Sequence, residues 1–376
     1  MTRRQPLTAQ VFKPLKALGL MSGTSLDGID AAIIVSDGSR LLEAGAATSE
    51  TYEPEFRKRL RGCLGLAAQA PGVADVAHEL TLRHAKIVKR LLDENGLDAS
   101  DIDLIGFHGH TTLHRPQDRL TVQIGDPALL AAQTGINVVG DFRSNDVAQG
   151  GEGAPFASLF HFALSDDLEK PLAMLNIGGV ANVTWIGEGG SVEDPNILAF
   201  DTGPGNALID DWVHETIARP MDEGGRLARG GMVNEKRLAQ LLDNTYFVEV
   251  PPKSLDREDF VKASQIVDGL SPADGAATLA AFSVQAIKKA IDHFPDSPKR
   301  WLVTGGGRHN DTLMAMLGQQ LGVPVEPIEA IGQNGDALEA QAFAFLAIRS
   351  FYGLPLSLPN TTRAPRPLGG GTLFEA

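Results

Sequence analysis

Residues 21–30 read MSGTSLDGID, and this turn-rich stretch separates two apolar runs, Ala17–Leu20 and Ile29–Val35. An apolar run, a glycine-rich turn and a β-branched run predict a strand, a loop and a second strand. The same arrangement returns at 172–186, where Asn176-Ile177-Gly178-Gly179 lies between two apolar runs. Since the unit occurs once in each half, we expect an α/β protein made of two related domains that face each other.

Strand and helix patterns alternate through the rest of the chain. Apolar residues at helical spacing over Val73–Asn95, followed by Gly96, predict a long helix. The polar, glycine-rich stretch Asp141–Pro155 breaks the alternation, and we interpret it as the hinge between the domains and a lining of the cleft. The other expected strands are Ile102–Phe107, Ile136–Val139, Ile197–Phe200 and Trp301–Thr304, and the other expected helices are Asp126–Thr134, Asn206–Ile217, Pro272–His293, Asn310–Leu321 and Gly335–Phe351.

Composition excludes several classes of protein. The 376 residues include 33 Lys and Arg against 47 Asp and Glu, a formal net charge of −14, which disfavours nucleic-acid binding. A single cysteine, Cys63, excludes an internal disulfide and a cysteine-cluster zinc site. No apolar run approaches the length of a membrane span, and Pro and Lys interrupt the first 20 residues too often for a secretory signal. We therefore expect a cytoplasmic enzyme or binding protein.

Glycine loops follow three of the expected strands, at Ser22–Gly28, Asp201–Gly205 and Gly305–Gly307. Such loops let backbone N–H groups approach phosphate oxygens, although a tight turn explains any single one equally well. None matches the P-loop or the dinucleotide-binding pattern. Three loops in two similar halves nevertheless indicate a nucleotide held between two lobes.

Asp201 is the sharpest candidate for chemistry, because it ends an apolar strand and precedes Gly203-Pro204-Gly205. A carboxylate there can accept a proton from a hydroxyl group or water, and the adjacent N–H groups can hold a phosphoryl group. The alternative, a carboxylate that only ties down its turn, is about equally favoured by the residues alone.

Polar residues elsewhere admit a ligand-binding or a purely structural role. His108, His110 and His114 lack the spacing of a zinc site, and we interpret them as hydrogen-bonding residues in a loop after a strand. In the expected hinge, Arg143, Asp146 and Glu152 could recognise a polar ligand, but salt bridges within the hinge are the favoured reading.

Six blocks in order along the chain resemble the anhydro-N-acetylmuramic acid kinase family. They extend through almost the whole sequence, and the pairing of GTSLDGID with FDTGPGN is far more specific than any single glycine loop. The blocks are Met21–Asp30 (MSGTSLDGID), Thr121–Asp126 (TVQIGD), Asp141–Pro155, Asn176–Thr184 (NIGGVANVT), Phe200–Asn206 (FDTGPGN) and Val303–Asn310 (VTGGGRHN).

The resemblance implies an actin-like ATPase fold, in which two ribonuclease H-like domains face each other across an ATP-binding cleft. Domain I would comprise 1–140 and 335–376, and domain II 141–334. It also implies a reaction: MgATP phosphorylates the 6-oxygen of 1,6-anhydro-N-acetylmuramic acid while water opens the anhydro bridge, giving N-acetylmuramic acid 6-phosphate in peptidoglycan recycling. A homodimer is implied in the same way.

The resemblance also assigns roles to residues. Asp201 resembles the general base for the attacking water, and Glu339 could contact the sugar or be a carboxylate on a helix surface. The other expected sugar-side residues are His110, Arg143 and Asp146. The expected nucleotide-side residues are Gly23, Thr24, Ser25, Leu26, Asp27, Gly28, Ile29 and Asp30, with Gly203 and Gly205, and with Gly305, Gly306 and Gly307 as the adenosine loop.

The chain departs from the pattern of the resemblance at three places. The wider superfamily begins its first phosphate loop with Asp for magnesium, whereas this chain has Met21-Ser22, so the Mg²⁺ ligands stay unassigned. Relatives commonly read HGQTVRH where this chain reads HGHTTLH from His108 to His114, and Gln or His where Glu152 stands.

Three alternatives to the ring-opening kinase stay open. They are an ordinary sugar or small-acid kinase, a non-catalytic ATP-dependent switch, and a metal-dependent hydrolase built on the histidines.

Overall fold

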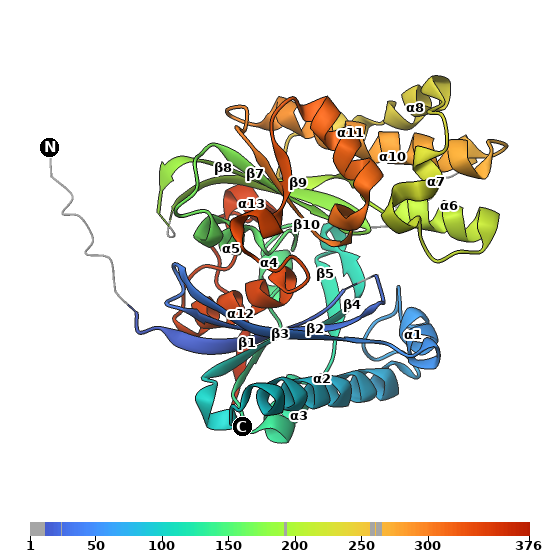
Figure 1. Cartoon of the computed structure of the whole chain (residues 1–376). Helices are drawn as coiled ribbons and strands as arrows, with labels where there is room; N and C mark the ends of the chain where they lie inside the picture. The colour runs from blue at the N-terminus through green and yellow to red at the C-terminus, as the bar shows by residue number, and fades with distance from the viewer. Residues whose placement is uncertain (1–11, 24, 192–193, 256–259, 261–264) are drawn as a thin grey trace, which may run out of the picture.

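Two mixed β-sheets, each with its own helices, form two lobes (Figure 1). The computed structural model describes residues 12–376 except 24, 192–193, 256–259 and 261–264. In the first lobe the strand order is β12-β6-β4-β1-β2-β3, and β5 pairs with β4. These strands are β1 Leu15–Ser22, β2 Gly28–Ser36, β3 Leu41–Thr51, β4 Leu104–Arg115, β5 Leu120–Ile124, β6 Val138–Gly140 and β12 Thr372–Phe374.

The second sheet repeats the topology of the first. Its order is β11-β10-β7-β8-β9, with bounds β7 Leu172–Ile177, β8 Val180–Gly190, β9 Pro195–Pro204, β10 Trp301–Thr304 and β11 Val325–Pro327. In each sheet the first three strands pair antiparallel in chain order, as β1-β2-β3 and as β7-β8-β9. Two later strands extend the sheet in parallel beyond its first strand: β4 and β6 beyond β1, and β10 and β11 beyond β7. This is the ribonuclease H-like order in both lobes, so the expected α/β class is confirmed.

The helices form three layers around these sheets (Figure 1). A core below the first sheet packs against α2, a core above the second sheet packs against α6 and α10, and a central core joins the two sheets through α5 and α12. The helices are α1 Pro54–Arg61, α2 Val73–Asn95, α3 Pro127–Thr134, α4 Ser144–Ala148, α5 Ser158–Leu164, α6 Ala207–Ile217, α7 Arg226–Arg229, α8 Glu235–Leu242, α10 Pro272–Lys289, α11 Asp311–Leu321, α12 Leu338–Phe351 and α13 Pro359–Thr362.

Two glycines let α12 lie directly on the first sheet. Gly19 of β1 and Gly106 of β4 are neighbours in the parallel register. A Cβ atom at Gly19 would collide with the carbonyl oxygen of Ala340, and one at Gly106 with that of Phe343. The helix backbone therefore rests on the strand backbones, and this close approach fixes where the first turn of α12 emerges between the lobes.

The sequence predicts most of the helices and strands, but two strands are longer in the structure than predicted. The helix over Val73–Asn95 is confirmed at both ends. β4 continues to Arg115, because β5 pairs with its second half, so His108, His110 and His114 lie in a strand and the expected loop there is wrong. β9 likewise continues to Pro204 along β8, which places Asp201 within the strand.

Among the residues that the structure describes, no helix is long and apolar enough to cross a membrane.

Candidate functional site

Asp201 lies in β9, where residues 253 and 255 hold it through their backbone groups. Its Oδ2 accepts a hydrogen bond from the N–H of Leu255 at 2.8 Å, and its own N–H donates to the carbonyl of Lys253 at 2.9 Å. The carboxyl group is buried, and burial raises its pKa to about 7, while the Leu255 N–H and the Arg143 cation act in the opposite direction. A carboxyl group with a pKa near neutrality can both take up and release a proton.

Arg143 precedes α4, and its guanidinium enters the same region. Its Nη1 donates to the carbonyl of Gly153 at 2.6 Å, and its Nε donates to Nε2 of His108 at 3.1 Å. Burial lowers the pKa of Arg143 to about 10, and the carboxylates of Glu339, Asp146 and Asp201 oppose that effect. Burial also keeps the pKa of His108 well below its usual value, so this neutral ring accepts from the arginine.

Glu339 reaches the site from the first turn of α12. Its Oε1 accepts a hydrogen bond from Nδ2 of Asn176, at the end of β7, at 3.1 Å. Burial raises the pKa of Glu339, and Arg143 and Asn176 lower it. Arg143, Asp201 and Glu339 thus converge from three elements, and the single cation faces two carboxyl groups.

The first glycine loop turns between β1 and β2. The N–H of Leu26 donates to the carbonyl of Gly23 at 3.1 Å, and Leu26 itself adopts a left-handed φ of 60°. Asp27 Oδ1 accepts from the Ser25 hydroxyl at 2.7 Å and from the Gly28 N–H at 3.0 Å. Thr24, also expected on the nucleotide side, lies outside the described residues.

Asp30 follows this loop on β2. Burial, together with the carboxylates of Asp27, Glu339 and Asp336, raises the pKa of Asp30 to about 7. Four acidic side chains therefore interact electrostatically near the first glycine loop. Ile29, next to Asp30, is buried in the core between the sheet and α2.

The glycines of the other two loops have tight packing requirements. A Cβ at Gly205 would collide with the carbonyl of Gly178, and the Gly205 N–H donates to the Gly179 carbonyl at 2.9 Å. Gly203 lies against Ala286 of α10. In the third loop, Gly305 has a φ of 73° and side chains at Gly305 and Gly307 would strike Asn176 and Ile177, whereas Gly306 faces open space.

His110 and Asp146 have internal partners. Nδ1 of the fully buried His110 lies 2.9 Å from the Ser22 hydroxyl, beneath the first glycine loop. Asp146 accepts from the Gly153 N–H at 2.7 Å and from the Thr362 hydroxyl at 2.6 Å. His110 thus holds the Ser22 side chain, and Asp146 holds the backbone at Gly153, whose carbonyl accepts from Arg143.

Sequence reasoning missed several residues that build this site. Asn176 and Arg308 lie in the NIGGVANVT and VTGGGRHN blocks, and their polarity next to glycine turns was the available signal. Arg308 connects the third glycine loop to the segment before α12, because it donates to Gly305, Glu329 and Asp336. Tyr246 and residues 253–255, which hold Asp201, carry no sequence motif.

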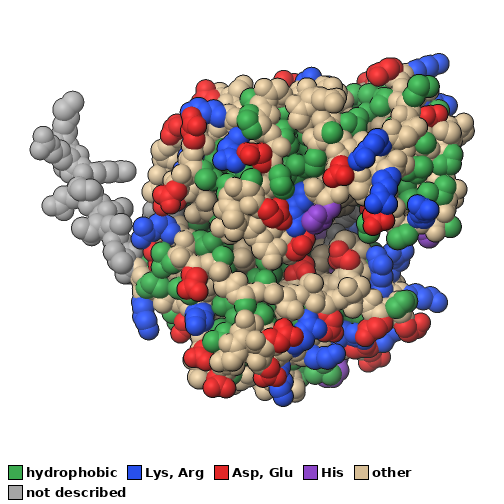
Figure 2. All heavy atoms as spheres, in the orientation of Figure 1, with side chains coloured by type: hydrophobic (Ala, Val, Ile, Leu, Met, Phe, Trp, Pro, Cys, Tyr) green, Lys and Arg blue, Asp and Glu red, His purple; other side chains and the backbone are tan. Residues whose placement is uncertain are grey.

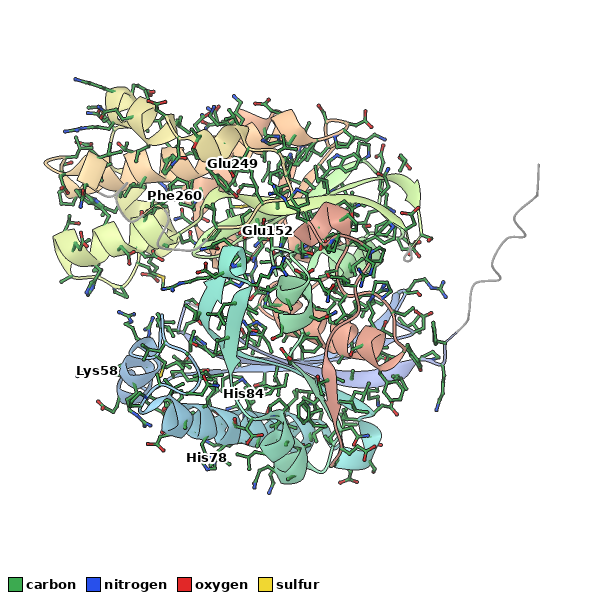
Figure 3. The ribbon with its side chains drawn as sticks, turned by 180° about the vertical axis from the view of Figure 1, so that it is seen from behind. Lys58, His78, His84, Glu152, Glu249 and Phe260 are labelled. Carbon is green, nitrogen blue, oxygen red and sulfur yellow. The ribbon has the colours of Figure 1, made fainter. Side chains whose placement is uncertain are left out.

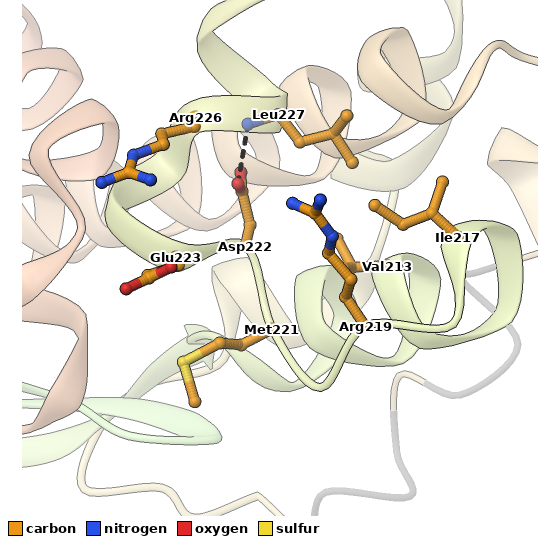
Figure 4. Close-up of a pocket in the computed structure, with 8 residues that line it drawn as sticks. All are labelled: Val213, Ile217, Arg219, Met221, Asp222, Glu223, Arg226 and Leu227. Carbon is orange, nitrogen blue, oxygen red and sulfur yellow. Dashed lines mark hydrogen bonds between the residues drawn. The ribbon is translucent and has the colours of Figure 1, made fainter.

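The surface is hollowed between the lobes, and acidic side chains gather at its rim (Figure 2). Asp201 lines neither of two further cavities. One of about 250 Å³ lies between the end of α6 and residues 219–227 (Figure 4). The other, of about 330 Å³, lies between β5 and the end of β6, and His108 forms part of its wall.

Comparison with known proteins gives the family. Among solved structures, the activator of 2-hydroxyisocaproyl-CoA dehydratase from Clostridium difficile aligns with a TM-score of 0.46 at 11% identity, covering 90% of this chain and 97% of that one. A curated relative from Rhodospirillum rubrum, named anhydro-N-acetylmuramic acid kinase, is 52% identical over 96% of this chain and 94% of its own length. A relative of the same name from Paramagnetospirillum magneticum is 53% identical over 94% of this chain and 98% of its own.

The profile of one family covers nearly the whole sequence. It matches residues 15–376, from the start of β1 to the last residue, and so includes both sheets and every residue of the site described above. Together with relatives that are more than half identical, this match shows that the chain belongs to the anhydro-N-acetylmuramic acid kinase family.

Proposed function

We propose that this protein is an ATP-dependent kinase that opens the anhydro ring of 1,6-anhydro-N-acetylmuramic acid with water and phosphorylates the 6-oxygen. The product is N-acetylmuramic acid 6-phosphate, and the reaction serves peptidoglycan recycling. The observation that carries the proposal is the buried Asp201 carboxyl group, with a pKa of about 7, opposite Arg143. The names of the curated relatives supply the substrate.

Asp201 acts as the general base. A water molecule attacks the anomeric carbon and gives its proton to the Asp201 carboxylate. The bond from the anomeric carbon to the bridging oxygen breaks, and that oxygen, which stays on carbon 6, takes the γ-phosphoryl group and releases ADP. Because two bond changes share one site, positioning of water, sugar and ATP supplies much of the acceleration.

Arg143 and Glu339 form the sugar side. The arginine offers N–H donors to sugar oxygens or to an acidic substituent, and its charge keeps Asp201 able to ionise. Glu339 accepts from donors on the sugar, and Asn176 orients it. His110 and Asp146 support the site through Ser22 and Gly153.

ATP lies between the lobes. The loop Gly23–Asp30 binds the phosphates from the first lobe, with the Gly203–Gly205 turn opposite. Gly305–Gly307 binds the adenosine, and the open space at Gly306 leaves room for it.

Magnesium fits the first glycine loop through water and phosphate. The described residues contain no group of three or more metal-ligating side chains close enough to hold an ion alone. The mutual repulsion of Asp30 with Asp27, Glu339 and Asp336 is the chemistry that a divalent cation relieves. Asp30 is thus the carboxylate that would hold magnesium through its water shell, and the ion would supply charge to the phosphates.

The domains divide as the resemblance implies, with 1–140 and 335–376 in the first and 141–334 in the second. The return of α12 and β12 to the first sheet supports this division. We also propose a cytoplasmic location and a homodimer, which follow from the family alone.

Labelled water tests the reaction. Purified protein is incubated with ATP, Mg²⁺ and the anhydro sugar in H₂¹⁸O, and the product is analysed by mass spectrometry. The proposal requires a phosphorylated product with ¹⁸O on the anomeric carbon. Phosphorylation without ¹⁸O would indicate an ordinary sugar kinase, and no phosphorylated product would overturn the proposed function.

A further inference from the structure

Glu152 lies between the lobes, in the loop that joins α4 to α5 (Figure 3). Its backbone is fixed on both sides, because the Glu152 N–H donates to the Thr362 carbonyl and the Gly153 N–H donates to Asp146. Its side chain points toward the second lobe, where Oε2 accepts a hydrogen bond from the Ser254 hydroxyl at 2.9 Å.

Ser254 is adjacent to the residue that holds the proposed base. The N–H of Leu255 donates to Asp201 Oδ2 at 2.8 Å, and the Lys253 carbonyl accepts from the Asp201 N–H at 2.9 Å. The hydrogen bond to Glu152 therefore anchors Ser254, the middle residue of the segment 253–255 that holds Asp201 and that we call the clasp. The same loop carries the Gly153 carbonyl that accepts from Arg143.

We propose that Glu152 is a positioning residue for Asp201: it fixes the clasp 253–255 through Ser254, and its negative charge keeps the Asp201 carboxyl group basic enough to take a proton from water. This inference rests on the proposed function of Asp201. It assigns a role to a carboxylate that stands apart from the reacting atoms and acts through another residue.

Among the residues that the structure describes, the charged side chains that act on the Asp201 carboxyl group are Arg143 and Glu152. Arg143, the residue before α4, favours the ionised form of Asp201, whereas Glu152 opposes its ionisation. The Lys253 ammonium is turned away, since it donates to the Tyr246 carbonyl at 2.6 Å. Arg363 lies 3.7 Å from Glu152 and is half exposed, so it moderates the charge of Glu152 without cancelling it.

Glu152→Gln removes the negative charge at this position and keeps the contact with Ser254, because glutamine retains an oxygen that can accept from the Ser254 hydroxyl. The matched control is Glu249→Gln, which removes an exposed carboxylate a few residues before the clasp (Figure 3). Aspartate labelled with ¹³C at its carboxyl carbon is titrated by NMR in the wild type and both variants, with the Asp201 signal identified by its loss in Asp201→Asn. The pH profile of kcat/KM is measured in parallel.

The expected result is a fall of about one unit in the pH midpoint of Asp201 in Glu152→Gln, with the acidic limb of kcat/KM moving equally. Glu249→Gln leaves both where they are. An unchanged Asp201 midpoint in Glu152→Gln, or an equal shift in both variants, would overturn the inference. If Glu152→Gln does not fold, Ser254→Ala keeps the test: it should lower kcat and leave KM for ATP unchanged, and an unaltered kcat contradicts the role.

The NMR titration needs no substrate, so it separates this inference from the proposed function. If the Asp201 midpoint shifts in Glu152→Gln but the wild-type protein phosphorylates no anhydro sugar, the coupling of Glu152 to Asp201 stands and the proposed reaction is wrong.

Discussion

Asp201 and Asp30 are carboxyl groups that folding removes from water, and the pKa of each rises to about 7. An aspartate in the unfolded chain titrates near about 3.9. The folded protein therefore binds these two protons more tightly than the unfolded chain, and the contribution of both groups to the free energy of unfolding falls as pH rises from about 4 to about 7. A base poised near neutrality thus lowers stability at the pH where it works.

Asp201→Asn should separate these two effects. The amide cannot take a proton, so turnover should fall by about 10²–10⁴-fold, while ATP binding measured by calorimetry stays unchanged. The amide also needs no ionisation, so the melting temperature should rise relative to wild type at pH 8 and much less at pH 4. Near-normal turnover would remove Asp201 from the mechanism, and an equal melting shift at both pH values would contradict the linkage.

Asp30→Asn should weaken the response to magnesium. Removing one of the mutually repelling carboxylates near the first glycine loop takes away the charge that attracts the cation. We expect the Mg²⁺ concentration for half-maximal activity to rise by about tenfold, and Mn²⁺ binding in the presence of an ATP analogue, followed by electron paramagnetic resonance, to weaken equally. Asp118→Asn, at an exposed position, is the control. Unaltered Mn²⁺ binding in Asp30→Asn would reject the role.

At the scale of elements, α12 connects sheet packing to the site. Its backbone rests on Gly19 and Gly106, and its first turn carries Glu339. Gly106→Ala should therefore lower the free energy of unfolding by about 1–3 kcal/mol, because its methyl group meets the Phe343 carbonyl. Gly318→Ala, on the exposed part of α11 with open space around it, should instead raise that free energy by about 0.5–1 kcal/mol. Chemical denaturation measures both, and equal effects would contradict the argument.

Sequence patterns predict elements best where periodicity is long and caps are present. α2 has nine buried residues at helical spacing and a left-handed Gly96 at its end, so both of its bounds follow from the sequence. β3 is composed largely of small and polar residues without alternation, and its pairing with β2 alone makes it a strand. The continuation of β4 past His108 depends in the same way on β5, a partner that lies later in the chain.

In the candidate site, too, local motifs could be predicted from the sequence and long-range contacts could not. Asp201 and the glycine turns are local motifs, so the sequence locates them. The clasp 253–255 and the hydrogen bond from Asn176 to Glu339 join residues that are 54 and 163 positions apart, and no local pattern records such distances.

For the whole molecule, the central core sets how the lobes can move. It includes residues of both sheets together with α5 and α12, so the lobes are joined at the base of the cleft. The hydrogen bond between Asn176 of β7 and Glu339 of α12 lies on this boundary. Closure must therefore pivot about the joined base and bring the outer parts of the lobes together.

Ligand-induced closure is the expected motion, with Asp141–Gly153 as the hinge. The proposed phosphate loop lies in the first lobe and the proposed adenosine loop in the second, so a bound nucleotide contacts both and favours the conformation in which they are closer. Small-angle scattering should show a smaller radius of gyration with a non-hydrolysable ATP analogue and the anhydro sugar together than with neither. Asp201→Asn, which keeps both binding surfaces, should close equally. Superimposable profiles with and without ligands would exclude closure, because the two lobes would then have the same separation in the free and in the bound protein.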